Sequence, residues 1–261
     1  MSKLHEELTA CLKELHLPAV RSDYQELADS ARREGLSYEA YLLEVVQREC
    51  QLRRQHRMER LLRSSRLPVD KSLAAFDLKR LPGKVAAVVR TLLDGSFVDR
   101  KENVLVFGNP GAGKSHLLCA LGQELARAGR RVYFSSTNLL VQELLLAKRE
   151  LRLPKAIKKL AGYAALILDD LGYVQQNREE MEVLFTLLAE RYERGSVLIT
   201  SNLPFSKWEL IFKDAMTTAA AIDRLVHHSV ILELNLPSYR VEQAKKSKAA
   251  TAPTEVPAVP K

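Results

Sequence analysis

The chain has 261 residues, of which 46% are hydrophobic, and a net charge of +8. This length allows one or two domains with a real core, and the basic excess favours a polyanionic partner or simply helps to keep the chain soluble. The three cysteines (Cys11, Cys50 and Cys119) lack C-x-x-C spacing, so we expect a reduced protein of the cytosol without a disulfide framework or zinc site. No apolar run reaches the ~18 residues of a membrane span, so we expect no membrane segment.

The first 66 residues are predicted to form a small all-helical region. Leu4, Leu8, Leu12 and Leu15 recur at helical spacing up to Pro18. A second amphipathic stretch begins near residue 22, and a third runs from residue 37 to about residue 66.

The third of these helices becomes strongly basic along its second half. Between residues 48 and 71 there are eight Lys or Arg and three acidic residues, a net charge of 8 − 3 = +5. Arg53, Arg57 and Arg60 would share one helical face. The stripe is interpreted either as a solvated helix face or as a surface for nucleic-acid phosphates.

A pattern of alternating strands and helices begins near residue 100. Short β-rich runs occupy residues 103–107, 131–135, 165–169, 197–201 and 230–234, with helical stretches between them. Strands buried on both faces read as continuous apolar runs. The pattern predicts an α/β domain with a parallel sheet of five strands.

A glycine-rich loop follows the first predicted strand. Residues 108 to 115 read GNPGAGKS, which fits G-x-x-x-x-G-K-[ST] at every fixed position between a strand and an apolar helix. Such a loop turns its backbone N–H groups around phosphates at a helix N-terminus. We therefore predict a site for ATP made by Gly108, Asn109, Pro110, Gly111, Ala112, Gly113, Lys114, Ser115 and His116, with Lys114 on the β- and γ-phosphates and the Ser115 hydroxyl on Mg²⁺.

Two later strands end in polar side chains that suit the same site. Asp169 closes the apolar run ALILD and is predicted to be the second Mg²⁺ anchor, and Asp170 follows as the group that polarises the attacking water. Asn202 follows the run VLITS and could hydrogen-bond the γ-phosphate or that water. The alternatives are aspartates that cap a turn and an ordinary turn asparagine before Pro204.

Arg224 lies just before the last predicted strand. It could pair with Asp223 or reach the γ-phosphate of a neighbouring subunit. His227 and His228 follow, but adjacent histidines on a helix point in different directions and no third ligand lies nearby in sequence, so a metal site is not expected there.

A second basic segment lies between the second and third predicted strands. It carries Lys148, Arg149, Arg152, Lys155, Lys158 and Lys159 against Glu150 alone. It is either a solvated helix or a second nucleic-acid surface. The last residues lack core side chains, so the chain is predicted to consist of a helical domain (1–66), an ATPase domain (67–243) and a disordered tail (244–261).

Taken together, these segments resemble AAA+ ATPases of the DnaA/DnaC clade, and within it the IstB family of transposition helper ATPases. The residues that carry the resemblance are VLVFGNPGAGKSHL, LILDDLGY, LLAERYERGSVLITSNLPFSKWELIF, AAAIDRLVHHSVILEL and PSYR. It covers roughly residues 5 to 243. One departure is Asp170, where glutamate is common in AAA+ proteins, and this leaves the speed of hydrolysis open.

The resemblance implies a set of roles. Asp170 would be the catalytic acid or base, Asn202 the sensor beside the γ-phosphate, Arg224 a finger given in trans, and Arg240 a weaker sensor candidate. It further implies a cytoplasmic bacterial protein that binds duplex DNA as an ATP-dependent homo-oligomer, a ring or a filament, and regulates a cognate transposase. A DnaC-type helicase loader is the alternative, and a DNA-binding architectural module with a degenerate nucleotide site is a third.

Overall fold

A computed structural model describes residues 3–172, 177–212, 215–239 and 241–242 of the chain. The chain divides into two compact units, residues 1–60 and residues 61–261. The domain boundary expected at residues 66/67 stays a prediction, and Arg240 and the expected tail at 244–261 lie outside the described residues.

The first unit is helical, as predicted. It contains α1 (Lys3–Glu14), α2 (Pro18–Glu34) and most of α3 (Tyr38–Ser64), which carries the chain into the second unit. Its core is small and consists of Leu12, Val20 and Val45, with partly buried side chains around them.

Glu49 of α3 is a buried carboxylate that holds α2 in place. Its Oε2 accepts the N–H groups of Ala19 at 3.0 Å and Val20 at 3.5 Å, at an α2 N-terminus that has no side-chain cap of its own. Arg53 donates to Glu49 Oε1 at 2.8 Å and to the His16 carbonyl at 2.7 Å. A carboxylate here satisfies free N–H groups and opposes the positive end of the helix dipole.

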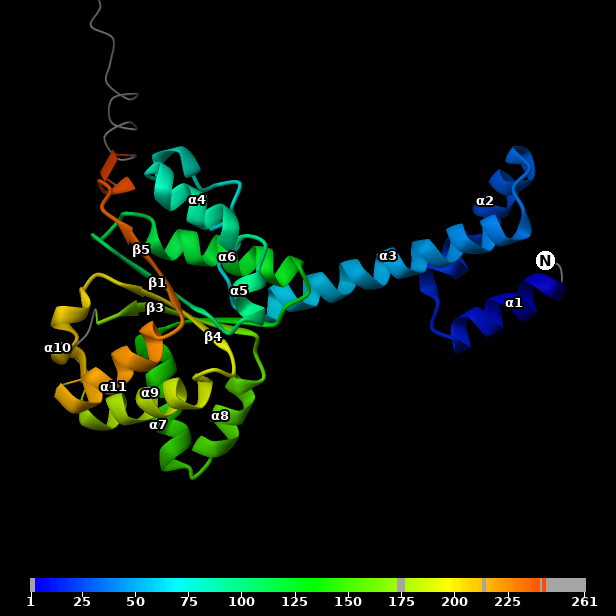
Figure 1. Ribbon diagram of the computed structural model, residues 1–261. Helices are drawn as coiled ribbons and strands as arrows, with labels where there is room; N and C mark the ends of the chain where they lie inside the picture. The colour runs from blue at the N-terminus through cyan, green and yellow to red at the C-terminus, as the bar shows by residue number, and fades with distance from the viewer. Residues whose placement is uncertain (1–2, 173–176, 213–214, 240, 243–261) are drawn as a thin grey trace, which may run out of the picture. The chain divides into compact units, whose positions relative to one another are not determined.

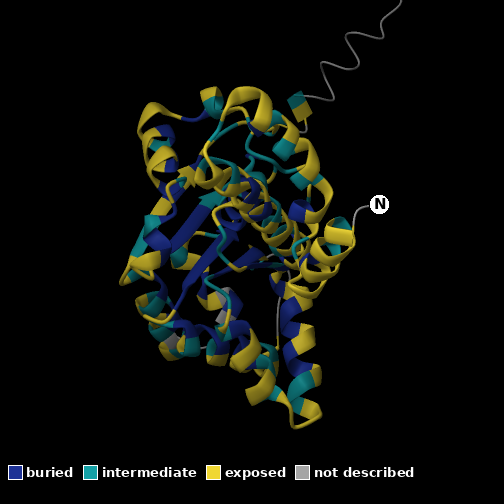
Figure 2. Ribbon diagram, turned by 90° about the vertical axis from the view of Figure 1, so that its right-hand side faces the viewer, coloured by how far each residue is buried: buried dark blue, intermediate teal, exposed yellow. Residues whose placement is uncertain are grey.

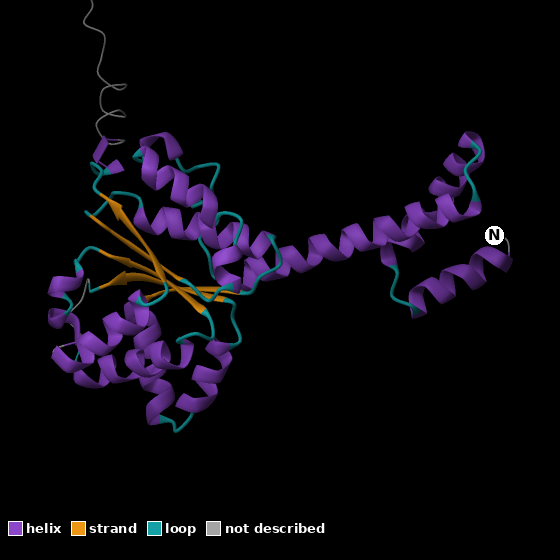
Figure 3. Ribbon diagram, in the orientation of Figure 1, coloured by secondary structure: helices purple, strands orange, loops and turns teal. Residues whose placement is uncertain are grey.

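The second unit is built on a five-stranded parallel sheet in the order β2-β3-β4-β1-β5, which confirms the predicted fold class (Figure 3). The strands are β1 (Asn103–Gly108), β2 (Val132–Ser136), β3 (Ala165–Leu171), β4 (Ser196–Ser201) and β5 (Ser229–Leu234). Because all five run the same way, their carboxyl ends meet at one edge of the sheet.

Helices cover both faces of this sheet (Figure 1). One face packs against α4 (Gly83–Leu92), α5 (Ser96–Asp99) and α6 (Lys114–Arg127), and the other against α7 (Thr137–Arg149), α8 (Leu153–Ala161), α9 (Arg178–Arg191), α10 (Glu209–Phe212) and α11 (Ala215–Val226). Two short 3-10 helices, η1 (Leu78–Arg80) and η2 (Phe205–Lys207), lie in the connections. Figure 2 shows the strands buried between the layers.

The strands read as apolar runs because successive side chains enter opposite cores. Val104 and Val106 belong to the core beneath α6, whereas Leu105 belongs to the core beneath α7 and α9. The three cysteines are free thiols, and burial raises the pKa of Cys119 to about 12. Within the described part of the chain, no helix has the length and apolar character needed to cross a membrane.

The contacts of Glu49 give a prediction for stability. Burial raises its pKa, but Arg53 and the two N–H groups lower it by more, so the pKa lies below the ordinary value of 4.5. We expect Glu49→Ala to reduce the free energy of unfolding of the helical unit by about 1–3 kcal/mol at neutral pH, because buried N–H groups lose their acceptor. Since the folded-state pKa is lowered, this difference is complete above 4.5 and fades as the pH falls through the folded-state pKa.

Circular dichroism melts at neutral pH and at about pH 3 measure the difference. Glu44→Ala, an exposed position on the same helix, is the control. Equal melting temperatures for the two variants at neutral pH would contradict the role of Glu49.

Candidate functional site

The glycine-rich loop connects β1 to α6 at the carboxyl edge of the sheet. Two of its glycines are required by close approach to other segments. A Cβ at Gly108 would lie 2.3 Å from the Leu234 carbonyl oxygen of β5, and a Cβ at Gly111 would lie 2.1 Å from Ser238 Oγ. Both also have positive φ angles, 149° and 81°. The loop is therefore packed against the chain that follows β5.

Lys114 begins α6, and its side chain returns over the loop. Nζ donates to the carbonyl oxygens of Gly108 at 2.8 Å and Asn109 at 3.1 Å. The residue is 7% exposed. Its ammonium group is thus held at the centre of the loop, where a phosphate chain would add negative oxygens around it.

The two aspartates lie in a bulge at the end of β3. The pairing of β3 with β4 shifts register between Leu168 and Leu171, and Asp170 has a φ of 57°. Asp169 is buried and Asp170 is exposed. A bulge of this kind re-aims a side chain, so the second carboxylate faces a pocket instead of following the alternation of the strand.

Thr200 of β4 connects both aspartates. Its Oγ1 donates to Asp169 Oδ1 at 2.6 Å and accepts the N–H of Asp170 at 2.8 Å. On the other side of β3, the Thr137 hydroxyl donates to the Asp169 carbonyl at 2.9 Å. Neither threonine could be identified from the sequence, because Thr200 lies inside an apolar run and Thr137 in a short polar stretch, and neither belongs to a motif.

A pocket of about 500 Å³ lies over the loop. Of the predicted nucleotide residues it is lined by Pro110, Gly111, Ala112, Gly113, Lys114, Ser115, His116, Asp170 and Asn202. Gly108 and Asn109 contribute the carbonyls that hold Lys114. Asp169 is not part of the lining, since it is held beneath by Thr200. The structure thus brings together at one edge residues that are far apart in sequence.

The segment before α4 forms one wall of the pocket. Asp70, Lys71, Ala75, Phe76, Asp77 and Arg80 line it. Phe76 meets His116 edge-on with ring centroids 5.2 Å apart, and His116 Nε2 lies 2.9 Å from the Ser72 carbonyl oxygen. Sequence reasoning missed this wall because it is an irregular segment without periodicity. The one local signal is Asp77, which caps η1 by accepting the N–H of Lys79.

The segment after β5 forms a second wall, with Leu236 and Tyr239 in the lining. The N–H of Tyr239 donates to the Gly111 carbonyl at 3.0 Å. Arg80 ties the two walls together. It donates to the Pro237 carbonyl at 3.2 Å and to Glu242 Oε2 at 2.8 Å, and its guanidinium lies 5.0 Å from the Tyr239 ring centroid.

Arg224 is not part of this pocket in its own chain. In the last turn of α11, its guanidinium lies 4.9 Å from the Phe185 ring centroid and donates to the Ala220 carbonyl at 3.0 Å. The ion pairs found among described residues do not include one between Arg224 and Asp223. The alternative that Arg224 pairs with Asp223 is therefore not supported.

The two basic surfaces differ in how their charges are used. Arg53 is engaged with Glu49 and His16, whereas Arg57 and Arg60 are exposed on α3. In the second surface Lys148 pairs with Glu182 and Arg152 with Glu150. Its remaining cations are exposed and take part in none of the ion pairs or side-chain hydrogen bonds found for the described residues: Arg149, Lys155, Lys158 and Lys159.

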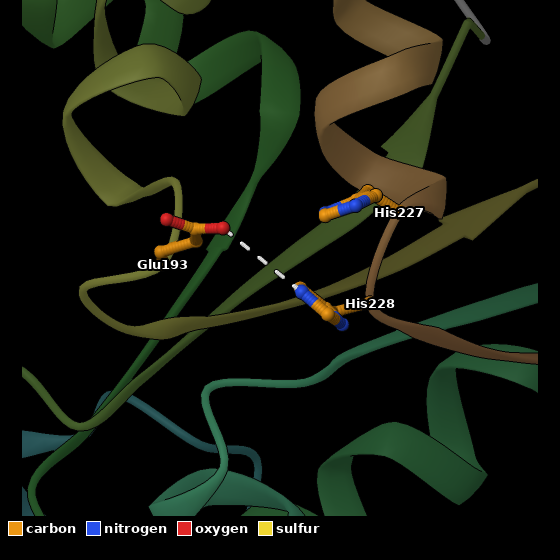
Figure 4. Close-up of side chains that lie close together, drawn as sticks. All are labelled: Glu193, His227 and His228. Atoms are coloured by element: carbon orange, nitrogen blue, oxygen red, sulfur yellow. Dashed lines mark ion pairs between the residues drawn. The ribbon is translucent and has the colours of Figure 1, made fainter.

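A third possible metal ligand lies near His227 and His228 in space, although it is distant from them in sequence. Glu193, in the turn between α9 and β4, brings its carboxylate to 4.0 Å from His228 Nε2 (Figure 4). One ligand atom from each of the three lies within 4.8 Å of the others. All three side chains are exposed, so the arrangement is that of surface residues and not of a closed metal cage.

The comparisons with known proteins agree with this geometry. Residues 10–248 match the family described as IstB-like ATP binding protein. An insertion sequence ATP-binding protein of Sinorhizobium fredii is 42% identical over 238 residues, which cover 91% of this chain and 80% of that protein. The ATP-binding protein of insertion sequence IS21 from Pseudomonas aeruginosa is 39% identical over 248 residues, which cover 95% and 94% of the two chains.

Two solved structures show the same fold. The DnaC helicase loader superposes with a TM-score of 0.54 at 19% identity, covering 64% of this chain and 98% of that one. DnaA from Aquifex aeolicus, bound to AMPPCP, superposes with a TM-score of 0.54 at 18% identity, covering 74% and 58%. The sheet and its flanking helices thus have the same fold as these two proteins. With the match extending over most of its length, the chain belongs to the family of IstB-like ATP binding proteins.

Proposed function

We propose that this protein is an ATP-hydrolysing helper of an insertion-sequence transposase, which assembles as a homo-oligomer on duplex DNA in the bacterial cytoplasm. The observation that supports it most is the convergence of Lys114, Asp170 and Asn202 on one pocket. The names of the relatives connect the family to insertion sequences and to ATP. Chemistry on the DNA ends would belong to the transposase.

In this proposal the phosphates of ATP lie along the glycine-rich loop. Lys114 exchanges its two carbonyl contacts for the β- and γ-phosphate oxygens. Ser115 and Asp169 offer a hydroxyl and a carboxylate, which are the hard oxygen donors that Mg²⁺ prefers. Bound there, Mg²⁺ would neutralise phosphate charge and align the β- and γ-phosphates.

The apolar part of the pocket suits the adenine base. Phe76 comes from the segment before α4, and Leu236 and Tyr239 come from the segment after β5. An aromatic ring and an aliphatic side chain together remove a flat base from water without demanding charge. We therefore assign the base to this end and the triphosphate to the loop.

Hydrolysis would depend on Asp170 and Asn202. Both are exposed to the pocket, Asp170 from the bulge and Asn202 after β4. The carboxylate would polarise the attacking water, and the amide would orient that water or the γ-phosphate. Arg224, which points elsewhere in its own chain, would complete the charge compensation at the pocket of a neighbouring subunit.

The exposed cations suggest where DNA binds. Arg57 and Arg60 on α3, and Lys155, Lys158 and Lys159 on α8, present charges to solvent. With Arg53, Lys148 and Arg149 they are the proposed phosphate contacts. Because phosphate contacts carry no direct sequence information, we infer binding that is largely independent of DNA sequence.

A replicative helicase loader is the second candidate function. The fold shared with the DnaC helicase loader is the observation in its favour. The insertion-sequence names of the relatives favour the transposition helper. Co-purification with a transposase encoded beside this gene, as opposed to a replicative helicase, distinguishes the two.

The nucleotide site predicts that binding and hydrolysis can be separated. Lys114→Ala removes the cation at the centre of the loop, and we expect ATP affinity to fall at least about tenfold, because charge-assisted contacts are lost. Asp170→Asn keeps the size of the side chain but not its charge. We expect it to bind ATP like the parent and to hydrolyse it at least about 10²-fold more slowly.

Fluorescent-ATP titration and phosphate release measure the two quantities. Asp77→Asn, another aspartate in the lining, is the control for removing a charge near the pocket. Parent-like hydrolysis by Asp170→Asn would assign the catalytic role to another residue. Parent-like ATP binding by Lys114→Ala would refute the nucleotide site itself.

Arg224 predicts complementation between subunits. Arg224→Ala should bind ATP but hydrolyse it about 10³-fold more slowly, as expected when an arginine finger is lost. Mixed with Lys114→Ala, it forms interfaces in which an intact Lys114 site faces an intact Arg224. We expect the mixture to recover part of the activity that each variant lacks alone.

Phosphate release by the mixture, with mixed oligomers verified by two affinity tags, is the measurement. Arg90→Ala, an exposed arginine on α4, is the control for an arbitrary lost arginine. A mixture that stays inactive would show that Arg224 acts in its own chain.

DNA binding is predicted to be electrostatic. If about six phosphates are contacted, the logarithm of affinity falls with the logarithm of salt concentration with a slope of about −5. Changing Lys155, Lys158 and Lys159 to Gln removes up to three contacts and should make the slope less steep by up to about 2.7. Lys84→Gln with Arg90→Gln, on α4, is the control. An affinity that does not respond to salt would contradict the phosphate surface.

A further inference from the structure

The corner between α7 and α8 carries a leucine where the backbone favours glycine. Leu151 has a φ of 55°. The N–H of Leu151 donates to the Lys148 carbonyl at 3.0 Å, and the N–H of Arg152 to the Ala147 carbonyl at 2.7 Å. This pair of bonds is the Schellman motif that ends a helix, with Leu151 at its left-handed position.

The same motif occurs after α6 with glycine in that position. There, the N–H of Gly129 donates to the Ala126 carbonyl at 3.0 Å, the N–H of Arg130 to the Leu125 carbonyl at 3.0 Å, and Gly129 has a φ of 85°. A left-handed conformation costs a residue with a Cβ roughly 1–2 kcal/mol. Among the described non-glycine residues with positive φ, Leu151 is the apolar one: the others are His16, Arg66, Lys101, Asp170 and Glu193.

Packing does not compensate for this cost. Leu151 is 91% exposed, so almost none of its side chain is buried against the described part of the fold. Single exposed leucines are common on proteins and need no explanation by themselves. Leu139 and Leu146 on α7 are of this ordinary kind, being 53% and 57% exposed on a regular helix. Leu151 differs because it combines nearly full exposure with an unfavourable backbone conformation.

The surroundings of Leu151 are cationic. Between residues 148 and 159 there are six Lys or Arg and one Glu, a net charge of 6 − 1 = +5. On α8, Ile157 and Leu160 are buried, so Lys155, Lys158 and Lys159 lie on the outer face. Arg149 is exposed on the other side of the corner. An apolar tip is thus flanked on both sides by charges available to phosphates.

We propose that Leu151 is a wedge that enters the minor groove of duplex DNA and partly unstacks two neighbouring base pairs. This assignment rests on the proposed DNA binding. Cations on either side would hold the two phosphate backbones, while the leucine side chain fills the gap that opens between the bases. Apolar side chains inserted in this way kink the duplex, and the deformation is offset by the surface that the bent DNA then contacts.

The test is a substitution that keeps the corner and removes the wedge. Leu151→Asn has a similar size and tolerates the left-handed conformation, and Leu151→Met keeps an apolar tip. The probe is a duplex with a fluorescent adenine analogue at successive positions, which brightens when unstacked, and with dyes at both ends to report bending. We expect the parent and Leu151→Met to brighten the analogue, and Leu151→Asn to lose more than about half of that signal and of the bend.

Three further readouts separate this role from a structural one. Leu151→Asn should melt no lower than the parent, because Asn tolerates the left-handed position better than leucine. Its salt slope should equal that of the parent, because the phosphate contacts remain. Leu139→Asn and Leu146→Asn, the matched exposed leucines, should unstack DNA like the parent.

The wedge is refuted if Leu151→Asn unstacks and bends DNA like the parent, or if it melts clearly below the parent, in which case Leu151 serves the fold. Loss of transposase binding with unstacking intact would instead make the corner a protein-docking site. If the parent itself shows no salt-dependent DNA binding, the proposed function fails together with the wedge.

Discussion

One threonine hydroxyl fixes the two adjacent carboxylates on which the site depends. Thr200 Oγ1 donates to Asp169 and accepts from the backbone of Asp170, so it joins β4 to the bulge of β3. In a regular strand the side chains of residues 169 and 170 would point to opposite faces of the sheet. Aspartate is among the residues that take a left-handed conformation with least strain, which gives a physical reason for an aspartate at position 170.

The pocket is closed by two chain segments, one before α4 and one after β5, and their positions depend on each other. Arg80 contacts Pro237, Glu242 and Tyr239, and Tyr239 in turn donates to the Gly111 carbonyl. The segment before α4 and the segment after β5 are therefore linked to each other and to the glycine-rich loop. A ligand that moves the glycine-rich loop would therefore also shift both of these segments.

Much of this fold can be predicted because the strands are buried on both faces. Their apolar runs locate the sheet to within a residue or two, and the glycine-rich loop locates its functional edge. The walls around Phe76 and Tyr239 could not be predicted, because irregular segments have no periodicity and their positions depend on long-range contacts. Arg53 illustrates the same limit: its place in a basic stripe does not reveal that Glu49 and His16 already hold it.

Two helices connect the nucleotide pocket to the basic corner at Leu151, which is the proposed DNA surface. The first residue of α7, Thr137, donates its hydroxyl to the carbonyl of Asp169, and the last turn of the same helix leads into the corner at Leu151. A helix of 13 residues spans ~20 Å as one rigid element. The second arm of the corner, α8, is also tied to the sheet, because buried Arg191 donates to the carbonyls of Leu160, Ala161 and Tyr163 and to that of Ser196 in β4.

Both arms of the basic corner thus end on the two strands that carry Asp169 and Thr200. If the Asp169 backbone shifted when a triphosphate bound, α7 would move with it and displace the corner at Leu151. This is expected because a helix moves as a rigid unit. By reciprocity, DNA that fixes the corner in one position would favour the arrangement of Asp169 that goes with it. The buried hydroxyl of Thr137 donates the hydrogen bond that joins the start of α7 to the Asp169 backbone, and this coupling would act through it.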